Sequence, residues 1–323
     1  MKGSEFGGDD MSTVMTALLT RAIAFVADCR VHDALGDYPH VGDLQWMLHN
    51  SASVLDAANW CFWQNAVGQD VGLGITDDDA ITVIVHPHAT DPFALKLEIR
   101  AWAIDRVREM FLADGDDLCR VWETVASDDW RMIQQVTDEG CGQHDFYMLQ
   151  YRRSLLEPLP ELLLPSGFRV SHVAGEGEVA RRAALHRDSF LPYSSKTLDE
   201  AMIKYRRAMQ MPGYDSTLDL VIVAPDGEWA AGGICWVDER NKVGLFEPIG
   251  TRPAYRRQGL ARALMVAGLW ELRQRGMVEA WVGANHPGTS GDRISVEFTS
   301  SRHVFEQVGF KVVRKLFTYY KDC

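Results

Sequence analysis

The chain has 323 residues, 46% of them hydrophobic and 24% charged, which is ordinary for a globular protein and predicts two domains. Its net charge of −12 argues against a nucleic-acid partner, and no apolar run approaches the roughly 20 residues of a membrane-spanning helix. Six scattered cysteines without a C-x-x-C pair are interpreted as reduced core thiols of a cytoplasmic protein.

The N-terminal half begins with a short glycine-bearing leader and continues into helical and strand patterns. Residues 1–10 are interpreted as an expression-vector remnant, with Met11 as the natural start. The apolar spacing and β-branched runs that follow predict, in chain order, helices 14–31 and 43–49, strands 60–64, 71–75 and 80–86, helix 93–112, strand 118–125, helix 129–139 and strand 146–152.

The ten histidines do not follow the spacing of a metal site. His86 and His88 flank a proline at a predicted strand end, where two imidazoles come close together. Since no third ligand stands near them in the sequence, we expect a loop pair and no metal.

A connector rich in proline and leucine, residues 154–167, separates the two halves. Its prolines favour an extended chain, and its leucines indicate that it packs against the protein. The second half then predicts strand 168–173, helices 178–188 and 198–210, strands 218–224, 230–237 and 243–249, helix 259–275, strand 278–282, helix 301–308 and strand 316–321. Thr197 is the expected N-cap of the second of these helices.

The two halves share one order of elements. Residues 80–152 and 243–321 each run strand, loop, helix, strand, helix, strand. We therefore predict an internal duplication, with a first copy over 11–153 and a second over 168–323. Antiparallel strands that feed a strand–helix crossover predict α/β (α+β) domains, each with a mixed, mostly antiparallel sheet and helices on both faces.

The loop before helix 259–275 has the features of a phosphate site. Gly259 at the helix start lets a ligand approach the backbone, where the unpaired N–H groups of the first turn attract an anion. Four arginines within eleven residues add positive charge to an otherwise acidic chain: Arg252, Arg256, Arg257 and Arg262. A solvated basic turn is the alternative reading.

The pattern Arg256-x-x-Gly259-x-Ala261, which follows a strand and opens a helix, resembles the acyl-CoA pyrophosphate loop of the GNAT superfamily of N-acyltransferases. Residues 304–310 (VFEQVGF) are similar to the later helix-to-strand element of that family. The resemblance covers roughly residues 168–321, about half of the chain. Tandem GNAT proteins with one degenerate copy exist, and the layout resembles that of mycothiol synthase.

The resemblance implies acetyl-CoA as co-substrate, without a metal. It implies that backbone groups contact the pantetheine at Ile249, Gly250 and Thr251. It further implies that the diphosphate is held by Arg256, Arg257, Gln258, Gly259, Leu260 and Ala261, and that Phe305 lies beside the coenzyme.

The corresponding loop of the first copy, residues 87–92, lacks these features. It has no glycine and no arginine, its prolines remove N–H donors, and Asp91 would repel a phosphate. We therefore expect the first copy to be structural and to shape the acceptor cleft.

Glu247 is the candidate catalytic base. In strand 243–249 it alternates with apolar residues, so we expect burial to raise its pKa to a value that suits a base acting on an ammonium group. Pro248 predicts a bulge or a locally opened strand pair, and in the GNAT family this strand splays from the next one. A buried carboxylate paired with an arginine is the alternative.

Phe305 departs from the family pattern. The family often places a tyrosine there to protonate the departing CoA thiolate, which phenylalanine cannot do. Tyr319 is our candidate for this role, with Tyr320, Tyr255 or water as alternatives, and simple strand packing is the competing explanation for these tyrosines.

These features predict an N-acetyltransferase that moves acetyl from acetyl-CoA to a primary amine of a small molecule or peptide, as a cytoplasmic monomer or homodimer. The negative charge is compatible with an amine-bearing acceptor. Phe190, Tyr193 and Trp236 are candidates to line the acceptor pocket, with core packing as the alternative. Two rival functions are a transferase with a different acyl donor and a non-catalytic acyl-CoA-binding module.

Overall fold

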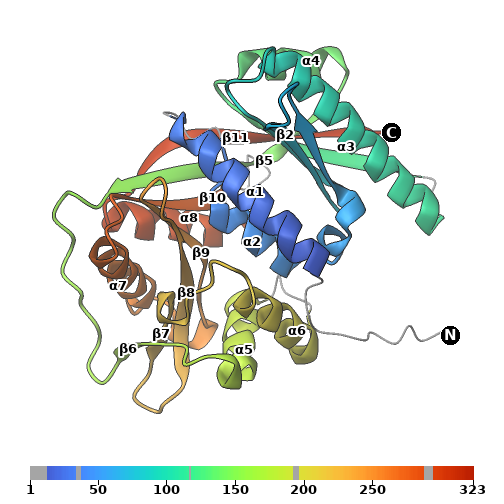
Figure 1. Cartoon of the computed structure of the whole chain (residues 1–323). Coiled ribbons are helices and arrows are strands. Elements are labelled where there is room, and N and C mark those ends of the chain that lie inside the picture. Colours follow the sequence, from blue (N-terminus) through green and yellow to red (C-terminus); the bar gives the residue numbers. More distant parts are fainter. Residues whose placement is uncertain (1–12, 34–37, 116–117, 192–195, 287–293) are drawn as a thin grey trace.

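The structure is a computed structural model that describes residues 13–33, 38–115, 118–191, 196–286 and 294–323 (Figure 1). Its helices, apart from short 3-10 turns, are α1 (Thr13–Val31), α2 (Val41–Asn50), α3 (Pro92–Asp114), α4 (Trp130–Asp138), α5 (Val179–Ser189), α6 (Leu198–Met209), α7 (Leu260–Gln274) and α8 (Ile294–Gln307). Its strands are β1 (Trp60–Gln64), β2 (Asp70–Asp77), β3 (Ala80–Val85), β4 (Arg120–Ala126), β5 (Gly142–Ser154), β6 (Arg169–His172), β7 (Asp219–Val223), β8 (Trp229–Asp238), β9 (Val243–Thr251), β10 (Glu279–His286) and β11 (Lys311–Asp322).

All eleven strands form one mixed sheet, in the order β1-β2-β3-β4-β11-β5-β10-β9-β8-β7-β6. The centre of this order is symmetric, because β3 and β4 are parallel, as are β9 and β10, whereas β4, β11, β5 and β10 pair antiparallel. Each half therefore places its last strand next to the other half. In Figure 1, β5 and β11 run from one half of the molecule into the other.

The last strand of each copy pairs with strands of the other copy, an arrangement that we call the exchange of β5 and β11. This symmetric arrangement supports the predicted duplication, although the sequence did not indicate the exchange. The two copies share one continuous sheet, so we propose the division at residues 154–167 as a topological boundary and not as a boundary between separate sheets. Separating the copies would break the pairing of β11 with β4 and of β10 with β5.

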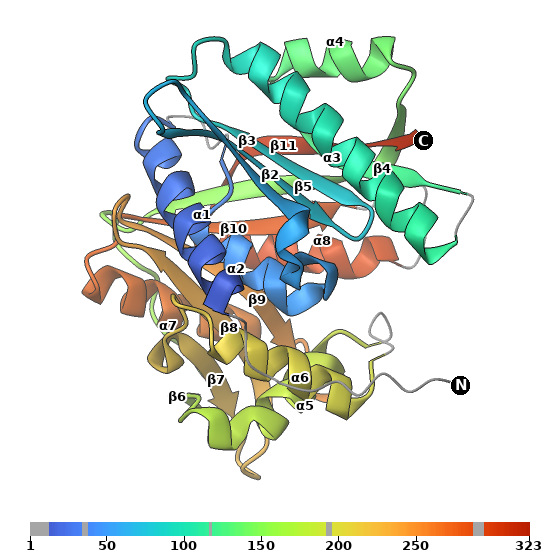
Figure 2. The same ribbon diagram turned by 45° about the vertical axis from the view of Figure 1, so that its right-hand side comes forward.

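Helices cover both faces of this sheet (Figure 2). A Cβ at Gly232 of β8 would meet Leu185 of α5 at 2.6 Å, whereas a Cβ at the next residue, Gly233, would meet Leu264 of α7 at 3.4 Å. Since successive residues of a strand point to opposite faces, α5 and α7 cover opposite sides. One core cluster joins α1, α2 and α6 to strands of both copies, so the N-terminal helices pack against the C-terminal half.

The predicted elements are present, but several of them are longer than predicted, and three begin well before their predicted start. Strand β5 begins four residues before the predicted 146, β11 five residues before 316, and α8 seven residues before 301. The first residues of β5 and β11 are mostly exposed, so they carry no hydrophobic alternation that would reveal a strand.

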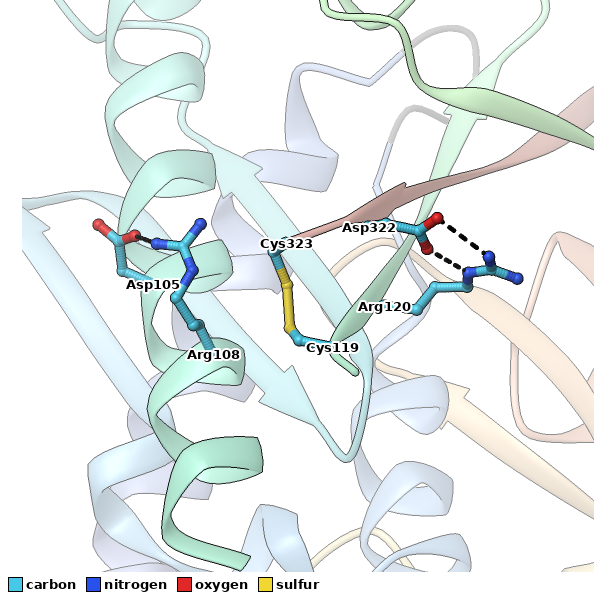
Figure 3. The surroundings of a disulfide bond; sticks show 6 residues. All are labelled: Asp105, Arg108, Cys119, Arg120, Asp322 and Cys323. Carbon is cyan, nitrogen blue, oxygen red and sulfur yellow. Dashed lines mark hydrogen bonds and ion pairs between the residues drawn. A yellow bond between two sulfur atoms is a disulfide. The ribbon is translucent and has the colours of Figure 1, made fainter. Parts of the chain in front are cut away.

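The prediction that all six cysteines are reduced is wrong. Cys119, directly before β4, and the C-terminal Cys323 form a disulfide, and the Cys323 N–H also donates to the Cys119 carbonyl at 3.0 Å (Figure 3). Arg120 and Asp322 form an ion pair at 2.6 Å beside it. The pairing of β11 with β4 brings together residues 204 positions apart, which the spacing of cysteines in the sequence could not indicate.

A thiol count tests this disulfide. Of the six cysteines, Cys29, Cys61, Cys141 and Cys235 are free, so unfolding without a reductant is expected to expose four reactive thiols per chain. Prior reduction should raise the count to all six. Six thiols without prior reduction would show that the terminal strand is not covalently fastened.

Candidate functional site

Strand β9 is interrupted where the sequence predicted a bulge. Gly233 of β8 faces Ile249, but Cys235 faces Phe246, so two residues of β9, Glu247 and Pro248, lie opposite one residue of β8, and these two are joined by a cis peptide bond. The prediction from Pro248 is confirmed.

Beyond this bulge, β9 leaves its other neighbour. The parallel pairing with β10 extends only from Val243 opposite Glu279 to Phe246 opposite Val282. From there β9 follows β8 to Thr251, while β10 follows β5 to His286. The two strands therefore diverge, and among the described residues no strand pairs with the backbone of β9 after Phe246 on the β10 side.

Helix α7 begins next to this divergence without a side-chain cap. Gly259 occupies the N-cap position in the left-handed region, with φ +79°, and a Cβ there would meet none of the described residues within 4 Å. In the first copy, by contrast, the Asp91 carboxylate caps α3 by accepting the Ala94 N–H at 3.0 Å. The first-turn amides of α7 are thus open to a ligand, whereas one donor of α3 is already satisfied.

Three of the four arginines of the loop bind other parts of the protein, and the fourth, Arg257, is exposed. Arg252 pairs with Asp188 at 3.3 Å, and Arg262 donates to the carbonyl of Glu161 at 3.2 Å. Arg256 donates to the carbonyls of Thr251 and Ser189, which fastens the loop to the end of α5.

Arg257 is exposed and, within the part of the chain that the structure describes, makes no hydrogen bond or ion pair. Its φ of +61° places it in the left-handed region directly before Gln258 and Gly259, which are also exposed. It is therefore the arginine of this loop that can turn towards an anion at the start of α7.

The last residues of β9 line the other side of the divergence. A Cβ at Gly250 would meet Ser189 at 2.6 Å and the Phe190 ring at 3.3 Å, so the absence of a side chain lets α5 approach β9 closely. Ile249 is partly buried between two core clusters. The Thr251 hydroxyl is buried and has no hydrogen-bond partner among the described residues.

The backbone of Glu247 is fixed by a hydrogen bond, and its carboxyl group is a weaker acid than usual. Burial, together with the nearby carboxylate of Asp43, raises its pKa to about 8. The Trp236 indole N–H donates to its carbonyl at 2.7 Å. No arginine is paired with the Glu247 carboxylate among the described residues, so the alternative of a structural ion pair receives no support from this part of the chain.

Asp43 is a functional candidate that the sequence analysis missed. It lies in α2, its pKa is raised to about 6 by burial, and one carboxylate oxygen accepts the His40 N–H at 2.7 Å. Helix α2 packs on β8 and β9 because Gly42 leaves room for the Trp236 side chain, which a Cβ would meet at 2.5 Å. The N-terminal half thereby brings a second carboxyl group to the Glu247 site.

The three tyrosines that we considered as acids lie elsewhere. Tyr319 packs against Val125 and Met132 in the core of the first copy, on β11, which is three strands from β9. Tyr320 packs against Trp122, and the Tyr255 hydroxyl donates to Asp226 at 3.1 Å on the surface.

A fourth tyrosine, Tyr151, lies beside Phe305. Its ring meets the Phe305 ring edge-on, with centroids 5.4 Å apart. Tyr151 belongs to β5 and faces Val282, the last residue of β10 that pairs with β9. Its hydroxyl is buried without a hydrogen-bond partner among the described residues, and burial raises its pKa. No local pattern points to this tyrosine, because β5 belongs to the other copy.

The expected acceptor-pocket residues have different surroundings. Trp236 is fully buried, so its side chain lies in the core and acts on the backbone of Glu247. Phe190 lies 4.7 Å from the His186 ring, and Tyr193 falls outside the described residues.

An aromatic cluster from both copies surrounds His186 near the Glu247 site. Trp46 stacks on His49 at 3.8 Å, and both rings contact Tyr205. The Tyr205 hydroxyl and His49 Nε2 are buried without hydrogen-bond partners among the described residues. The Glu247 carboxylate contributes to the raised pKa of Tyr205, which places this cluster within electrostatic reach of the candidate base.

The expectation that His86 and His88 have no third ligand nearby is wrong. His32, directly after α1, brings its ring to within 4.4 Å of the His88 ring and 5.8 Å of the His86 ring, measured between centroids. His32 is distant from both in the sequence, so only the packing of α1 on β3 could reveal the cluster.

A pocket of about 290 Å³ lies away from this site, between α3, α4 and β11. Its Arg100 is already paired with Glu123 at 2.6 Å and with Glu139 at 2.8 Å. The positive charge of Arg100 is therefore balanced within the protein. The pocket also lies away from the open start of α7 and from the divergent strands β9 and β10.

Comparison with known proteins agrees with this geometry. The model of the Acetyltransferase (GNAT) family matches residues 183–290, which contain the bulge, the divergence and the start of α7. This segment of the C-terminal half is therefore similar to the GNAT family. It is 32% identical over 180 residues to a mycothiol acetyltransferase of Nocardia farcinica, an alignment that covers 53% of the chain and 56% of that relative. The chain thus spans about half the length of this curated relative.

Solved structures extend the likeness to both halves of the chain. A GCN5-related N-acetyltransferase from Sphaerobacter thermophilus covers 95% of the chain and 93% of its own length, with a TM-score of 0.64 and 16% identity. A tandem GNAT protein from the clavulanic acid biosynthesis pathway covers 95% of each chain, with a TM-score of 0.62 and 12% identity. At these identities the match establishes the tandem GNAT fold. No helix of the described residues is long and apolar enough to cross a bilayer.

The raised pKa of Glu247 predicts that the stability of the protein depends on pH. Between the unfolded pKa near 4.5 and about 8, the folded state holds a proton that the unfolded state releases, so stability falls as pH rises through this window. Glu247→Gln is expected to be more stable than the wild type by about 2 kcal/mol above pH 8, roughly half the full linkage value because the side chain is partly exposed. At pH 4 the two should not differ.

Urea unfolding at pH 4 and pH 8.5 measures this difference. Glu161→Gln, at an exposed position of the connector, is the matched control and should not change stability at either pH. An equal effect of Glu247→Gln at both pH values would contradict the assigned acidity.

Proposed function

We propose that the chain is an N-acetyltransferase that transfers acetyl from acetyl-CoA to a primary amine by direct attack. The observation that carries the proposal is the divergence of β9 from β10 next to the uncapped start of α7. An anionic group fits such a helix start, and an extended amide-bearing chain fits a strand edge that has lost its partner.

The residues that would bind the coenzyme fall into two groups. The first-turn amides of α7 and the cation of Arg257 would hold the diphosphate, with Arg256 fastening the loop: Arg256, Arg257, Gln258, Gly259, Leu260 and Ala261. The backbone of Ile249, Gly250 and Thr251 would pair with the amides of pantetheine. Both groups lie on the segment that directly follows the bulge.

Glu247 would serve as the base, directly or through an oriented water. A pKa of about 8 lies near that of an alkylammonium group in a partly desolvated site, so proton transfer would cost little. The neutral amine would then attack the thioester carbon, and backbone N–H groups of the divergent strand would stabilise the oxyanion. The Trp236 indole fixes the backbone that carries Glu247.

Tyr151 would donate a proton to the CoA thiolate. In the family this role often belongs to a tyrosine at the position that Phe305 occupies here. Its buried, unpartnered hydroxyl beside Phe305 supports this role, as does its raised pKa, which keeps it protonated. The donor would then come from the first copy, through the exchanged strand β5.

Tyr151→Phe tests this assignment because it removes only the hydroxyl. We expect kcat to fall about 10- to 100-fold with little change in the Kd of acetyl-CoA. Tyr319→Phe is the matched control, since Tyr319 is also a buried tyrosine, and it should retain full kcat. Equal rates for Tyr151→Phe and wild type would remove Tyr151 from the mechanism.

The acceptor class is proposed as a small molecule or peptide with a primary amine. One relative is named a mycothiol acetyltransferase, and the carboxyl groups of Glu247 and Asp43 suit a cation. We also propose a cytoplasmic location, where four free cysteines would be typical and the Cys119–Cys323 disulfide would be the exception.

An amine panel with a free-thiol readout tests the function as a whole. The expected result is thiol release from acetyl-CoA that depends on both protein and one class of amine. Release with propionyl-CoA or longer donors in preference to acetyl-CoA would correct the donor. Binding of acetyl-CoA with no thiol release on any amine would favour a non-catalytic binding module instead.

A further inference from the structure

Three imidazoles meet in the first copy, far along the chain from the Glu247 segment. His32 follows the end of α1, and His86 and His88 lie in the loop between β3 and α3. One ring nitrogen of each lies within 4.8 Å of the others. His86 is buried, with 8% of its surface exposed, whereas His32 and His88 are exposed and can adjust.

The hydrogen bonds of His86 select the tautomer that a metal needs. The backbone N–H of His88 donates to His86 Nδ1 at 3.1 Å, so this nitrogen carries the lone pair, and a metal ion bound there would replace that hydrogen bond. His86 Nε2 therefore carries the proton, and it lies 3.2 Å from Asp28 Oδ2. A metal-bound histidine in proteins commonly donates its other N–H to a carboxylate, which orients the ring and increases its basicity.

Stacking of exposed rings would explain why His32 lies against His88, but it would not explain the position of the His86 ring. His86 is anchored by Asp28, and Asp28 is in turn held by the guanidinium of Arg240 from the second copy. In a tetrahedral site with metal–nitrogen distances of 2.0–2.1 Å, ligand nitrogens lie roughly 3.3 Å apart. Rotation of the two exposed side chains around the fixed His86 can supply this contraction from 4.8 Å.

The histidine cluster lies at the position in the first copy that corresponds to the arginine-bearing loop of the second copy. The loop that holds His86 and His88 precedes α3, as the loop with Arg256 precedes α7 in the second copy. Asp91 caps α3 and disfavours an anion there. The loop that carries arginines in one copy thus carries imidazoles and a carboxylate neighbour in the other, a set of donors that suits a divalent cation.

We propose that His32, His86 and His88 bind one divalent ion of the zinc class, with Asp28 as the carboxylate that positions His86. Imidazole nitrogen is a preferred donor for zinc, cobalt, nickel and copper, and three such ligands leave one coordination position open to solvent. The ion would link the end of α1 to the β3–α3 loop. This proposal goes beyond the acetyltransferase reaction and does not depend on it.

Cobalt(II) titration of the metal-free full chain tests the site by a readout that is independent of activity. The wild type is expected to bind one equivalent and to show the visible d–d bands of a nitrogen-ligated, four-coordinate ion, and zinc should abolish these bands by displacement. His88→Ala should weaken binding at least tenfold. Asp28→Asn should weaken it roughly 10-fold or more, as expected for loss of a carboxylate that orients a ligand.

Controls separate the cluster from incidental binding. His303→Ala, which removes an exposed histidine of α8, should bind cobalt like the wild type. Zinc should also raise the thermal midpoint of the wild type and not that of the His32→Ala/His88→Ala double variant. The proposal is overturned if the wild type binds no more cobalt than this double variant, whether or not the protein binds acetyl-CoA.

Discussion

Replacing Gly259 by aspartate is expected to weaken acetyl-CoA binding roughly 100-fold, about 2.7 kcal/mol. The new carboxylate would lie at the start of α7, where the proposed diphosphate binds. The carboxylate and the diphosphate would then be close together, and their negative charges would repel each other. It would also cap the helix and so compete for the amides, as Asp91 does at α3. Isothermal titration with acetyl-CoA measures the loss.

Gly259→Asn is the matched control for this change. Asparagine has nearly the same shape as aspartate, and both tolerate the left-handed backbone conformation that Gly259 adopts. The asparagine variant should lose only a few-fold in affinity, so the difference between the two variants isolates charge. Gly177→Asp adds the same charge at another uncrowded glycine and should bind like the wild type. Equal affinity for the Gly259→Asp and Gly259→Asn variants would place the diphosphate elsewhere.

Replacing Glu247 by glutamine is expected to lower kcat/KM by about 100- to 10,000-fold at pH 7.5, the usual range for a positioned general base. The affinity for acetyl-CoA should stay the same, because the diphosphate contacts lie on α7. In the wild type, kcat/KM should rise with pH and level off above about 8, as the carboxyl group loses its proton. The glutamine variant should lack this rise.

Asp43→Asn provides an independent test of the same base. The Asp43 carboxylate helps to raise the pKa of Glu247, so its neutralisation should lower that pKa and shift the rising limb to lower pH. Asparagine keeps the acceptor for the His40 N–H, so the start of α2 should stay intact. A rising limb that survives in Glu247→Gln, or that does not move in Asp43→Asn, would assign the base to another group.

Much of the fold could be predicted from the sequence because most elements carry their own periodicity. The apolar stripe of α7 and the β-branched run of β3 identify these elements without tertiary information, and Pro248 correctly indicated the bulge in β9. The exchange of β5 and β11 could not be predicted, because local patterns do not state which strand pairs with which. The disulfide of Cys119 with Cys323 depends on that exchange and was missed with it.

The residues of the proposed coenzyme site could be named from the sequence, whereas most residues around the proposed base could not. Residues 247–261 are contiguous, so the pattern Arg256-x-x-Gly259-x-Ala261 and the strand directly before it could be interpreted together. Asp43, Tyr151 and the aromatic cluster around His186 come from distant segments, and only the packing of α2 and β5 on the second copy brings them near Glu247. His32 joined His86 and His88 in the same way, through the packing of α1.

A crystal structure of the full chain with coenzyme A is the most direct test of the proposed site. We predict that the diphosphate lies against the amides of residues 259–261, with the pantetheine extending between β9 and β10 after Phe246. A coenzyme bound elsewhere, or a β9–β10 pairing that continues past Phe246 and Val282 and closes the gap, would contradict the central claim.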